Sequence, residues 1–190
     1  ITKLTEELKE NPFDPNSFAR PDQSKVTHIH LALKLDFDRH TLTGDTVLTV
    51  AKVAPNATKL LLDTVDLTIS GVELFTENGT STTASKLNFT LHPAVPEFGA
   101  KLEIDISPMK ASSAKIRVIY ATAPTSRALQ WLKPEQTDGG KVPFMFSQCE
   151  AINARSLLPC QDTPAVKATY TAEVNDNLGC WIASNIAFLH

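Results

Sequence analysis

The 190-residue sequence lacks several features that would assign it a function directly. It has seven glycines and no glycine-rich phosphate-binding loop. It contains neither a G-x-S-x-G nucleophile elbow nor an H-E-x-x-H zinc motif. No catalytic residue and no metal ligand set can therefore be nominated from a motif. On the residues alone, we expect a binding module, or one part of a larger enzyme, without a catalytic apparatus of its own.

The sequence also lacks a surplus of positive charge and any long apolar run. Its 18 Lys and Arg residues are outnumbered by 21 Asp and Glu residues, which gives a net charge of −3. This balance argues against a nucleic-acid-binding protein. No apolar run approaches the roughly 18 residues of a membrane span, and no charged-then-apolar signal segment opens the chain. We therefore expect neither nucleic acid nor a membrane among its partners.

Cysteine is scarce, with three residues at Cys149, Cys160 and Cys180. An odd, small number does not build a disulfide framework, and the spacings fit no zinc-ligand template. We interpret all three as reduced thiols of a cytoplasmic protein. The alternative is a secreted, glycosylated protein. It is suggested by three N-x-Thr sequons, which begin at Asn56, Asn78 and Asn88.

What the sequence does contain is a repeated alternation of apolar and polar residues. The first stretch, Thr27–Phe37, predicts a strand with one buried face, followed by a turn at Arg39–Gly44 and a second strand at Thr46–Val53. Further strands are predicted at 59–63, 67–74, 86–91, 101–106, 115–121, 144–146 and 169–174. Short strands without amphipathic helices between them predict a mostly β, mainly antiparallel domain with little helix.

Three segments are expected along the chain. Residues 1–23 should be peripheral, because their prolines block regular structure after one helical turn near Thr5–Leu8. Residues 24–174 should form the β domain, and residues 175–190 a separate tail. Within the domain, the region Pro124–Gly140 is predicted to be a loop with an apolar island at Leu129–Leu132, and Gln148–Leu158 to hold a turn or two of helix.

Two groups of residues are candidates for chemistry. His28 and His30 share one face of a strand, but no third ligand is suggested nearby, so we expect a structural or solvent-facing role. The stretch Phe146–Arg155 places polar side chains directly after a predicted strand, where ligand contacts are common. A simpler interpretation is that Arg155 pairs with Asp162, or with Glu150, and only holds the loop.

This stretch resembles a known family. The run Phe146–Ile152, with Arg155 and then Leu158–Pro164, is similar to the pattern Q-x-E-A-x-x-A-R followed by P-C-x-D-x-P. That pattern lies at the end of the N-terminal domain of zinc aminopeptidases, of which the leukotriene A4 hydrolase type is the most similar. Supporting likenesses, in the right order between Thr27 and Val174, occur at 41–44, 62–69, 128–137 and 167–174.

The resemblance implies a twisted, saddle-like β domain that caps a separate catalytic domain of the same polypeptide. Zinc is implied in that other domain and no cofactor in this chain, which should be inactive alone. The resemblance assigns Gln148 and Glu150 to the free α-amine of a peptide substrate, with Cys149 lining the same pocket. Arg155 and Asp162 would support the loop. We also expect an exposed apolar surface near the loop, with Trp131 and Phe146 at its edge.

Two departures from the family pattern leave alternatives open. Glu150 stands where leukotriene A4 hydrolases have glutamine, which favours peptide cleavage over epoxide hydrolysis. After Val174 the tail no longer resembles the family, and it is a divergent strand, an alternative C-terminus or an artefact of the gene model. The chain is alternatively a stand-alone binding or scaffold protein, a truncated isoform, or an inactive regulator that competes with the full enzyme for its catalytic half.

Overall fold

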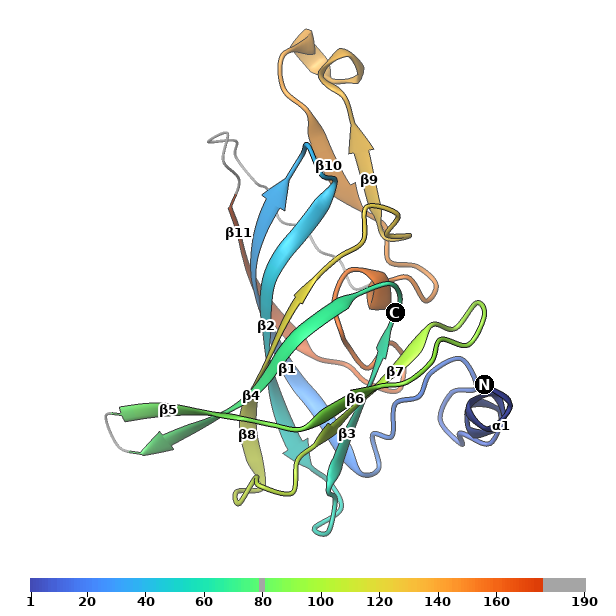
Figure 1. Ribbon diagram of the computed structural model, residues 1–190, viewed down its shortest axis with the longest axis vertical. Coiled ribbons are helices and arrows are strands. Elements are labelled where there is room, and N and C mark those ends of the chain that lie inside the picture. The colour runs from blue at the N-terminus through green and yellow to red at the C-terminus, as the bar shows by residue number, and fades with distance from the viewer. Residues whose placement is uncertain (79–80, 176–190) are drawn as a thin grey trace.

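Strands make up most of the regular structure of the computed structural model, which describes residues 1–78 and 81–175 (Figure 1). Residues 176–190 of the predicted tail 175–190, with Cys180, and two residues of the sequon at Asn78 lie outside the described residues. The helical elements are α1 (Thr2–Lys9), η1 (Pro134–Gln136), η2 (Asp138–Gly140) and η3 (Ala154–Ser156). No helix among the described residues is long and apolar enough to cross a membrane.

The largest sheet has six strands in the order β11-β1-β2-β8-β4-β5. Its members are β1 (Ser24–Asp36), β2 (Thr41–Lys52), β4 (Thr68–Asn78), β5 (Ser81–Lys86), β8 (Ser113–Ala121) and β11 (Thr169–Asn175). All neighbours are antiparallel except β11, which runs parallel to β1 and places Tyr170 beside Ile29. The predicted mostly β, mainly antiparallel fold is confirmed, and the edge strand β11 is the exception to antiparallel pairing.

A second sheet of three strands packs against the first and closes the core. It consists of β3 (Lys59–Thr64), β7 (Ala100–Asp105) and β6 (Phe89–Leu91). Leu31 and Leu48 of the large sheet share one apolar cluster with Leu62 and Ile104 of the small sheet, and all four side chains are fully buried. Apolar residues recur at alternate positions over much of these strands, so each strand contributes one face to this core.

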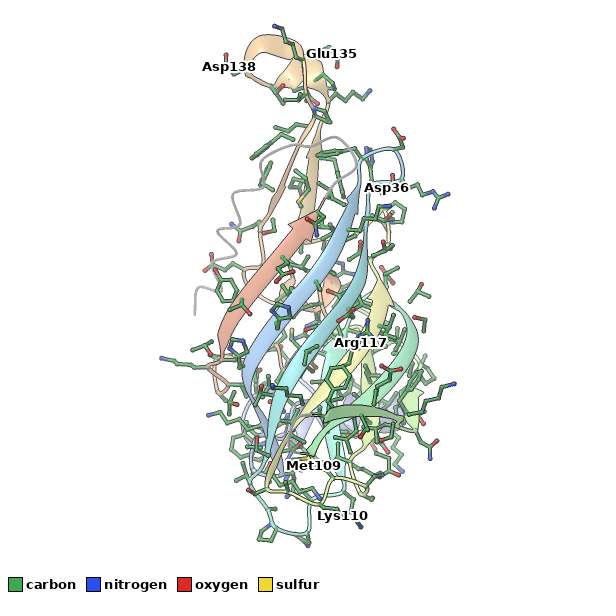
Figure 2. The ribbon with its side chains drawn as sticks, turned by 90° about the vertical axis from the view of Figure 1, so that its left-hand side faces the viewer. Asp36, Met109, Lys110, Arg117, Glu135 and Asp138 are labelled. Carbon is green, nitrogen blue, oxygen red and sulfur yellow. The ribbon has the colours of Figure 1, made fainter. Side chains whose placement is uncertain are left out.

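The other face of the large sheet is polar, as the alternation predicts. It is the face shown in Figure 2, where Arg117 lies near the middle. The Arg117 guanidinium reaches Asp45 on β2 at 2.7 Å and Glu73 on β4 at 3.4 Å. Both carboxylates therefore hold the pKa of Arg117 above its ordinary value, through a hydrogen bond to Asp45 first of all.

Three predicted element boundaries are wrong. Strand β2 begins at Thr41, so the turn is shorter than predicted and covers residues 37–40. Position 44, inside this strand, requires glycine because a Cβ there would sit 2.1 Å from the carbonyl oxygen of Ala32. The predicted strand 86–91 is divided between β5 and β6. The island Leu129–Leu132, predicted within a loop, forms β9 and pairs with β10 (Phe144–Ser147).

The β9–β10 hairpin projects from one end of the molecule, beyond the turn between β1 and β2 (Figure 1). Trp131 joins it to that turn, since its ring lies edge-on to Phe37 at 5.7 Å and stacks on His40 at 5.0 Å. Phe144 and Phe146 face outward, and their rings lie 6.3 Å apart. The hairpin therefore packs on one side and exposes apolar surface on the other.

The N-terminal segment packs onto the β domain over more residues than the single helical turn that was predicted. Helix α1 runs for eight residues, and Leu4 and Leu8 on one of its faces form a small apolar cluster with Phe18 and Val95. Beyond the helix, Ser17 and its two successors are almost fully buried. The segment therefore reaches the interior of the domain.

Candidate functional site

The predicted substrate-binding residues lie together on the loop that follows β10. The backbone N–H of Gln148 donates to the carbonyl oxygen of Ala128 at 2.8 Å, which fixes where the loop leaves the hairpin. Gln148 and Glu150 are exposed, and Cys149 between them is half-buried against the core. This alternation leaves the side chains of Gln148 and Glu150 open to a ligand, while the backbone at Gln148 is fixed to the hairpin.

Hydrogen bonds within the loop determine which polar groups are available. The backbone N–H of Glu150 donates to Gln148 Oε1 at 3.1 Å, so that oxygen keeps one further lone pair. The Asn153 side chain donates to the carbonyl oxygen of Glu150 at 3.0 Å, and its backbone N–H donates to that of Cys149 at 2.9 Å. No hydrogen bond or ion pair occupies the Glu150 carboxylate within residues 1–78 and 81–175, so both of its oxygens are available to a donor.

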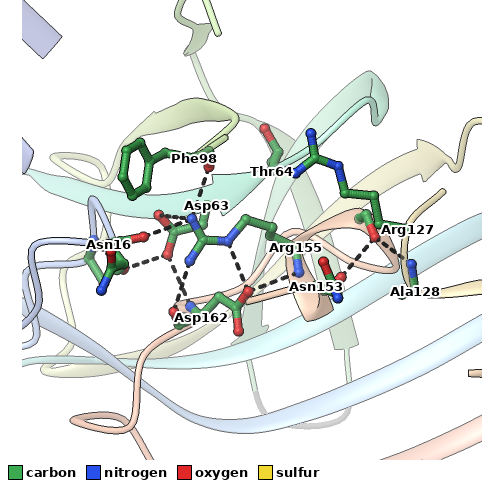
Figure 3. Close-up of polar contacts among 12 residues, drawn as sticks. Asn16, Asp63, Thr64, Phe98, Arg127, Ala128, Asn153, Arg155 and Asp162 are labelled. Carbon is green, nitrogen blue, oxygen red and sulfur yellow. Dashed lines mark hydrogen bonds and ion pairs between the residues drawn. The ribbon is translucent and has the colours of Figure 1, made fainter. Parts of the chain in front are cut away.

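Arg155 lies beneath the loop with its side chain fully buried (Figure 3). Its Nε donates to Asp162 Oδ2 at 2.9 Å, and Nη2 donates to the Asp162 carbonyl oxygen at 3.0 Å. Nη1 donates to the carbonyl oxygens of Asn16 at 2.8 Å and Phe98 at 2.9 Å. The pairing of Arg155 with Asp162 is thus present, and the alternative pairing of Arg155 with Glu150 is wrong.

Asp63 is a central residue of this site that the sequence did not reveal. Its carboxylate lies 3.9 Å from Arg155 Nη1 and accepts hydrogen bonds from the Phe18 N–H at 2.7 Å, the Asp162 N–H at 3.0 Å and the Ser17 hydroxyl. Burial raises the pKa of Asp63 to about 6, although Arg155 and these donors oppose the shift. The sequence feature that could have indicated Asp63 is its place directly after three leucines, Leu60–Leu62.

We call Asp63, Arg155 and Asp162 the ion cluster. Removing three charged groups from water costs free energy, and the cluster recovers it only through dense hydrogen bonding. Burial lowers the pKa of Arg155, but Asp63 and Asp162 more than compensate and leave it above its ordinary value. The Arg155 guanidinium therefore stays charged beneath the loop, with acceptors at Nε, Nη1 and Nη2.

The two described cysteines are unpaired thiols. Burial raises the pKa of Cys149 to about 11 and raises that of Cys160 well above its ordinary value. A thiol with so high a pKa is protonated at neutral pH and is a weak nucleophile. Cys149 can therefore line a pocket as a small neutral side chain, with no covalent chemistry.

The donor groups of the described residues do not fit a zinc site. His28 and His30 contact the hydroxyl groups of Thr169 and Thr171 through Nδ1, each at 2.8 Å. No group of three or more His, Cys, Asp or Glu residues that could hold a metal ion occurs in the part of the chain that the structure describes.

Exposed apolar side chains precede the loop. Val142, Phe144 and Phe146 on the hairpin have between 43% and 53% of their surface exposed. Phe146 thus lies where an apolar edge was expected, whereas Trp131 is half-buried against Phe37 and His40. A surface of this kind is typical of a contact with another domain or protein.

Residues 24–189 match the model of the Peptidase M1 N-terminal domain family. This match begins at the first residue of β1 and extends past residue 174 into the predicted tail, so the boundary between 174 and 175 remains a prediction.

Two curated relatives illustrate the similarity. The chain is 40% identical over 164 residues to leukotriene A-4 hydrolase of Xenopus laevis, which covers 85% of this chain and 26% of the relative. It is 37% identical over 166 residues to leucine aminopeptidase 2 of Yarrowia lipolytica, with 86% and 24% covered. The chain therefore spans about a quarter of the length of the curated relatives it matches.

Solved structures share the fold. The yeast LTA4 hydrolase in complex with bestatin superposes with a TM-score of 0.76 at 32% identity, which covers 88% of this chain and 25% of that one. The M1 zinc metallopeptidase of Deinococcus radiodurans superposes with a TM-score of 0.57 at 21% identity, over 83% of this chain and 33% of that one. At that identity the second likeness concerns the fold alone.

Proposed function

The chain belongs to the Peptidase M1 N-terminal domain family, and from this we propose that it is the substrate-anchoring domain of a cytoplasmic zinc aminopeptidase of the leukotriene A4 hydrolase type. In this proposal a separate zinc-binding domain of the same polypeptide hydrolyses the peptide bond. The present chain binds the free N-terminus of the peptide and is inactive alone. The names of its relatives, which include a leukotriene A-4 hydrolase and a leucine aminopeptidase, support the proposal.

The observation that carries the proposal is the exposed Glu150 carboxylate. An α-ammonium group has three N–H donors and needs acceptors, and a carboxylate provides charge-assisted hydrogen bonds. Glu150 has both oxygens available, and Gln148 Oε1 keeps one lone pair beside it. Two side chains of one loop can therefore accept from the same ammonium group.

The loop is also rigidly supported, and rigidity matters for anchoring. A substrate held by a mobile side chain loses the advantage of orientation, because the reacting bond is no longer placed reproducibly. Here the loop is fixed at Gln148 by the hairpin and at Arg155 by the buried ion cluster. We infer that the domain selects peptides with a free N-terminus and orients them toward the catalytic domain.

The natural polypeptide that contains this domain provides the test. We expect it to bind zinc and to hydrolyse aminoacyl reporter substrates with a free amine, while N-acetylated reporters are poor substrates. The chain of residues 1–190 should show no turnover in the same assay. Equal hydrolysis of free and acetylated reporters would contradict amine anchoring, and turnover by residues 1–190 would contradict the division of labour between the domains.

A further inference from the structure

Residues 1–23 lie before the family match, yet their end enters the buried ion cluster. Asn16 offers its carbonyl oxygen to Arg155 Nη1 at 2.8 Å (Figure 3). Ser17 and Phe18 donate to opposite oxygens of the Asp63 carboxylate, from a hydroxyl group and a backbone N–H. The Ser17 side chain is fully buried and Phe18 is nearly so, hence water does not replace these donors.

We propose that Asn16, Ser17 and Phe18 are positioning residues for the loop that carries Gln148 and Glu150. They do not touch a substrate. They complete the hydrogen bonding of Asp63 and Arg155, and Arg155 in turn fixes the end of the loop. The consequence for substrate binding rests on the function proposed above, whereas the effect on loop rigidity does not.

The path from the N-terminal segment to the loop consists of short contacts. Arg155 belongs to η3, and its backbone N–H and Nε both donate to Asp162 Oδ2, at 3.2 and 2.9 Å. Its carbonyl oxygen accepts from the Val65 N–H at 2.8 Å. Two residues earlier, Asn153 holds the carbonyl oxygens of Cys149 and Glu150. A displacement of Arg155 therefore moves the residues that shape the loop.

Short polar side chains give the N-terminal segment the shape that this role requires. Asp14 Oδ1 accepts from the backbone N–H of Asn16 at 2.8 Å, and the Asp14 carbonyl oxygen accepts from the N–H of Ser17 at 3.2 Å. The Asn11 side chain donates to the carbonyl oxygens of Ser17 at 2.7 Å and Ala19 at 3.0 Å. Such local side-chain bonds hold a loop in one conformation. The donors for Asp63 are thus presented in one arrangement.

Ser17→Ala tests the proposal, with Ser24→Ala as its matched control. Ser17→Ala removes the hydroxyl donor of Asp63 Oδ2 and, with it, the acceptor of the Ala19 N–H. Ser24 is equally buried, and its hydroxyl donates to the Lys59 carbonyl oxygen at 2.9 Å, away from the ion cluster. Asn11→Ala is a milder second variant, because it loosens the segment and leaves every atom of the cluster in place.

The first readout is amide hydrogen exchange in residues 1–190, under conditions in which each variant is folded. The reporters are the backbone amides of Asn153 and Ser156, which donate within and just after the loop. We expect both to exchange about 10-fold faster in Ser17→Ala than in Ser24→Ala, since a buried acceptor has lost a donor. Asn11→Ala should raise the same two rates less. Equal rates in Ser17→Ala and Ser24→Ala would overturn the positioning role.

The second readout is kinetic and uses the natural polypeptide with its catalytic domain. Ser17→Ala should raise KM for peptides with a free N-terminus by about 3- to 10-fold and change kcat less, with Ser24→Ala near wild type. Faster loop exchange with an unchanged KM would uphold the positioning role and overturn amine anchoring by the loop. The two proposals therefore fail in different measurements.

Discussion

Replacement of Arg155 by methionine probes the ion cluster directly. The side chain is fully buried and makes four hydrogen bonds, two to Asp162 and one each to the carbonyl oxygens of Asn16 and Phe98. Methionine retains much of the apolar stem and removes the charge. Two buried carboxylates then remain without a cation, and the carbonyl oxygens of Asn16, Phe98 and Asp162 each lose a donor.

The expected loss of stability follows from this burial. Breaking a buried ion pair from one side costs about 3–5 kcal/mol in the free energy of unfolding. Arg117→Met is the matched control, because Arg117 also contacts two carboxylates but about a third of its side chain is exposed. Exposed pairs contribute about 0–1 kcal/mol. Arg155→Met should therefore destabilise the chain several times more than Arg117→Met.

Urea unfolding followed by far-UV circular dichroism measures both variants. The loss in the free energy of unfolding caused by Arg155→Met, called the deficit below, should also depend on pH. The pKa of Asp63 is raised to about 6 in the folded chain, so the folded state binds the proton more tightly, and stability is lost as the pH rises through that value. Without Arg155 this loss grows, so the deficit should be larger at pH 7.5 than at pH 5. Equal deficits for the two arginine variants, or a deficit independent of pH, would refute the account of the cluster.

Two further predictions concern backbone packing and thiol chemistry. Gly44→Ala should destabilise the chain by at least about 2 kcal/mol in thermal unfolding, because its Cβ would meet the Ala32 carbonyl oxygen at 2.1 Å. Gly139→Ala, whose Cβ meets nothing within 4 Å, should cost about 1 kcal/mol, and equal losses would show the close approach to be absent. Cys149 should react with iodoacetamide at pH 8 about 100-fold more slowly than an ordinary thiol, since burial raises its pKa from 9.0 to about 11. Peptide mapping of the alkylated chain measures that rate. If Cys149 reacted as fast as a free thiol, the burial of its side chain would be contradicted.

Local patterns predicted the fold where one face of a strand is buried. The alternation in Thr27–Phe37 is a direct consequence of burial on one face, and β1 lies there. The start of β2 was missed because Thr41–Gly44 has the composition of a turn. What keeps Gly44 extended is contact with the neighbouring strand at Ala32, and residues near Gly44 in sequence do not encode that contact.

The same distinction applies to the site. Arg155 and Asp162 are seven residues apart, so their pairing was visible in the sequence. Asp63 lies 99 residues from Asp162 and 46 from Ser17, and Arg155 lies 139 from Asn16. These contacts are made only when the two sheets and the N-terminal segment pack together. A motif can therefore predict the loop and its family, but the support beneath the loop requires the fold.

The proposed role of Glu150 is to anchor the amine of the substrate. Glu150→Gln keeps the shape of the side chain and removes its charge, in a polypeptide that includes the catalytic domain. A hydrogen bond to a charged group is worth about 1.5–3 kcal/mol, so kcat/KM for peptides with a free N-terminus should fall roughly 10- to 100-fold. Glu135→Gln is the control, because it makes the same change at the tip of the hairpin, where Glu135 is exposed (Figure 2).

The decisive measurement is kcat/KM of wild type, Glu150→Gln and Glu135→Gln with free and N-acetylated forms of one peptide. Anchoring predicts a large loss for Glu150→Gln on the free peptide only, little change on the acetylated peptide, and no change for Glu135→Gln on either. An equal loss on the free and the acetylated peptide would contradict the claim, because the acetylated form has no ammonium group for Glu150 to hold.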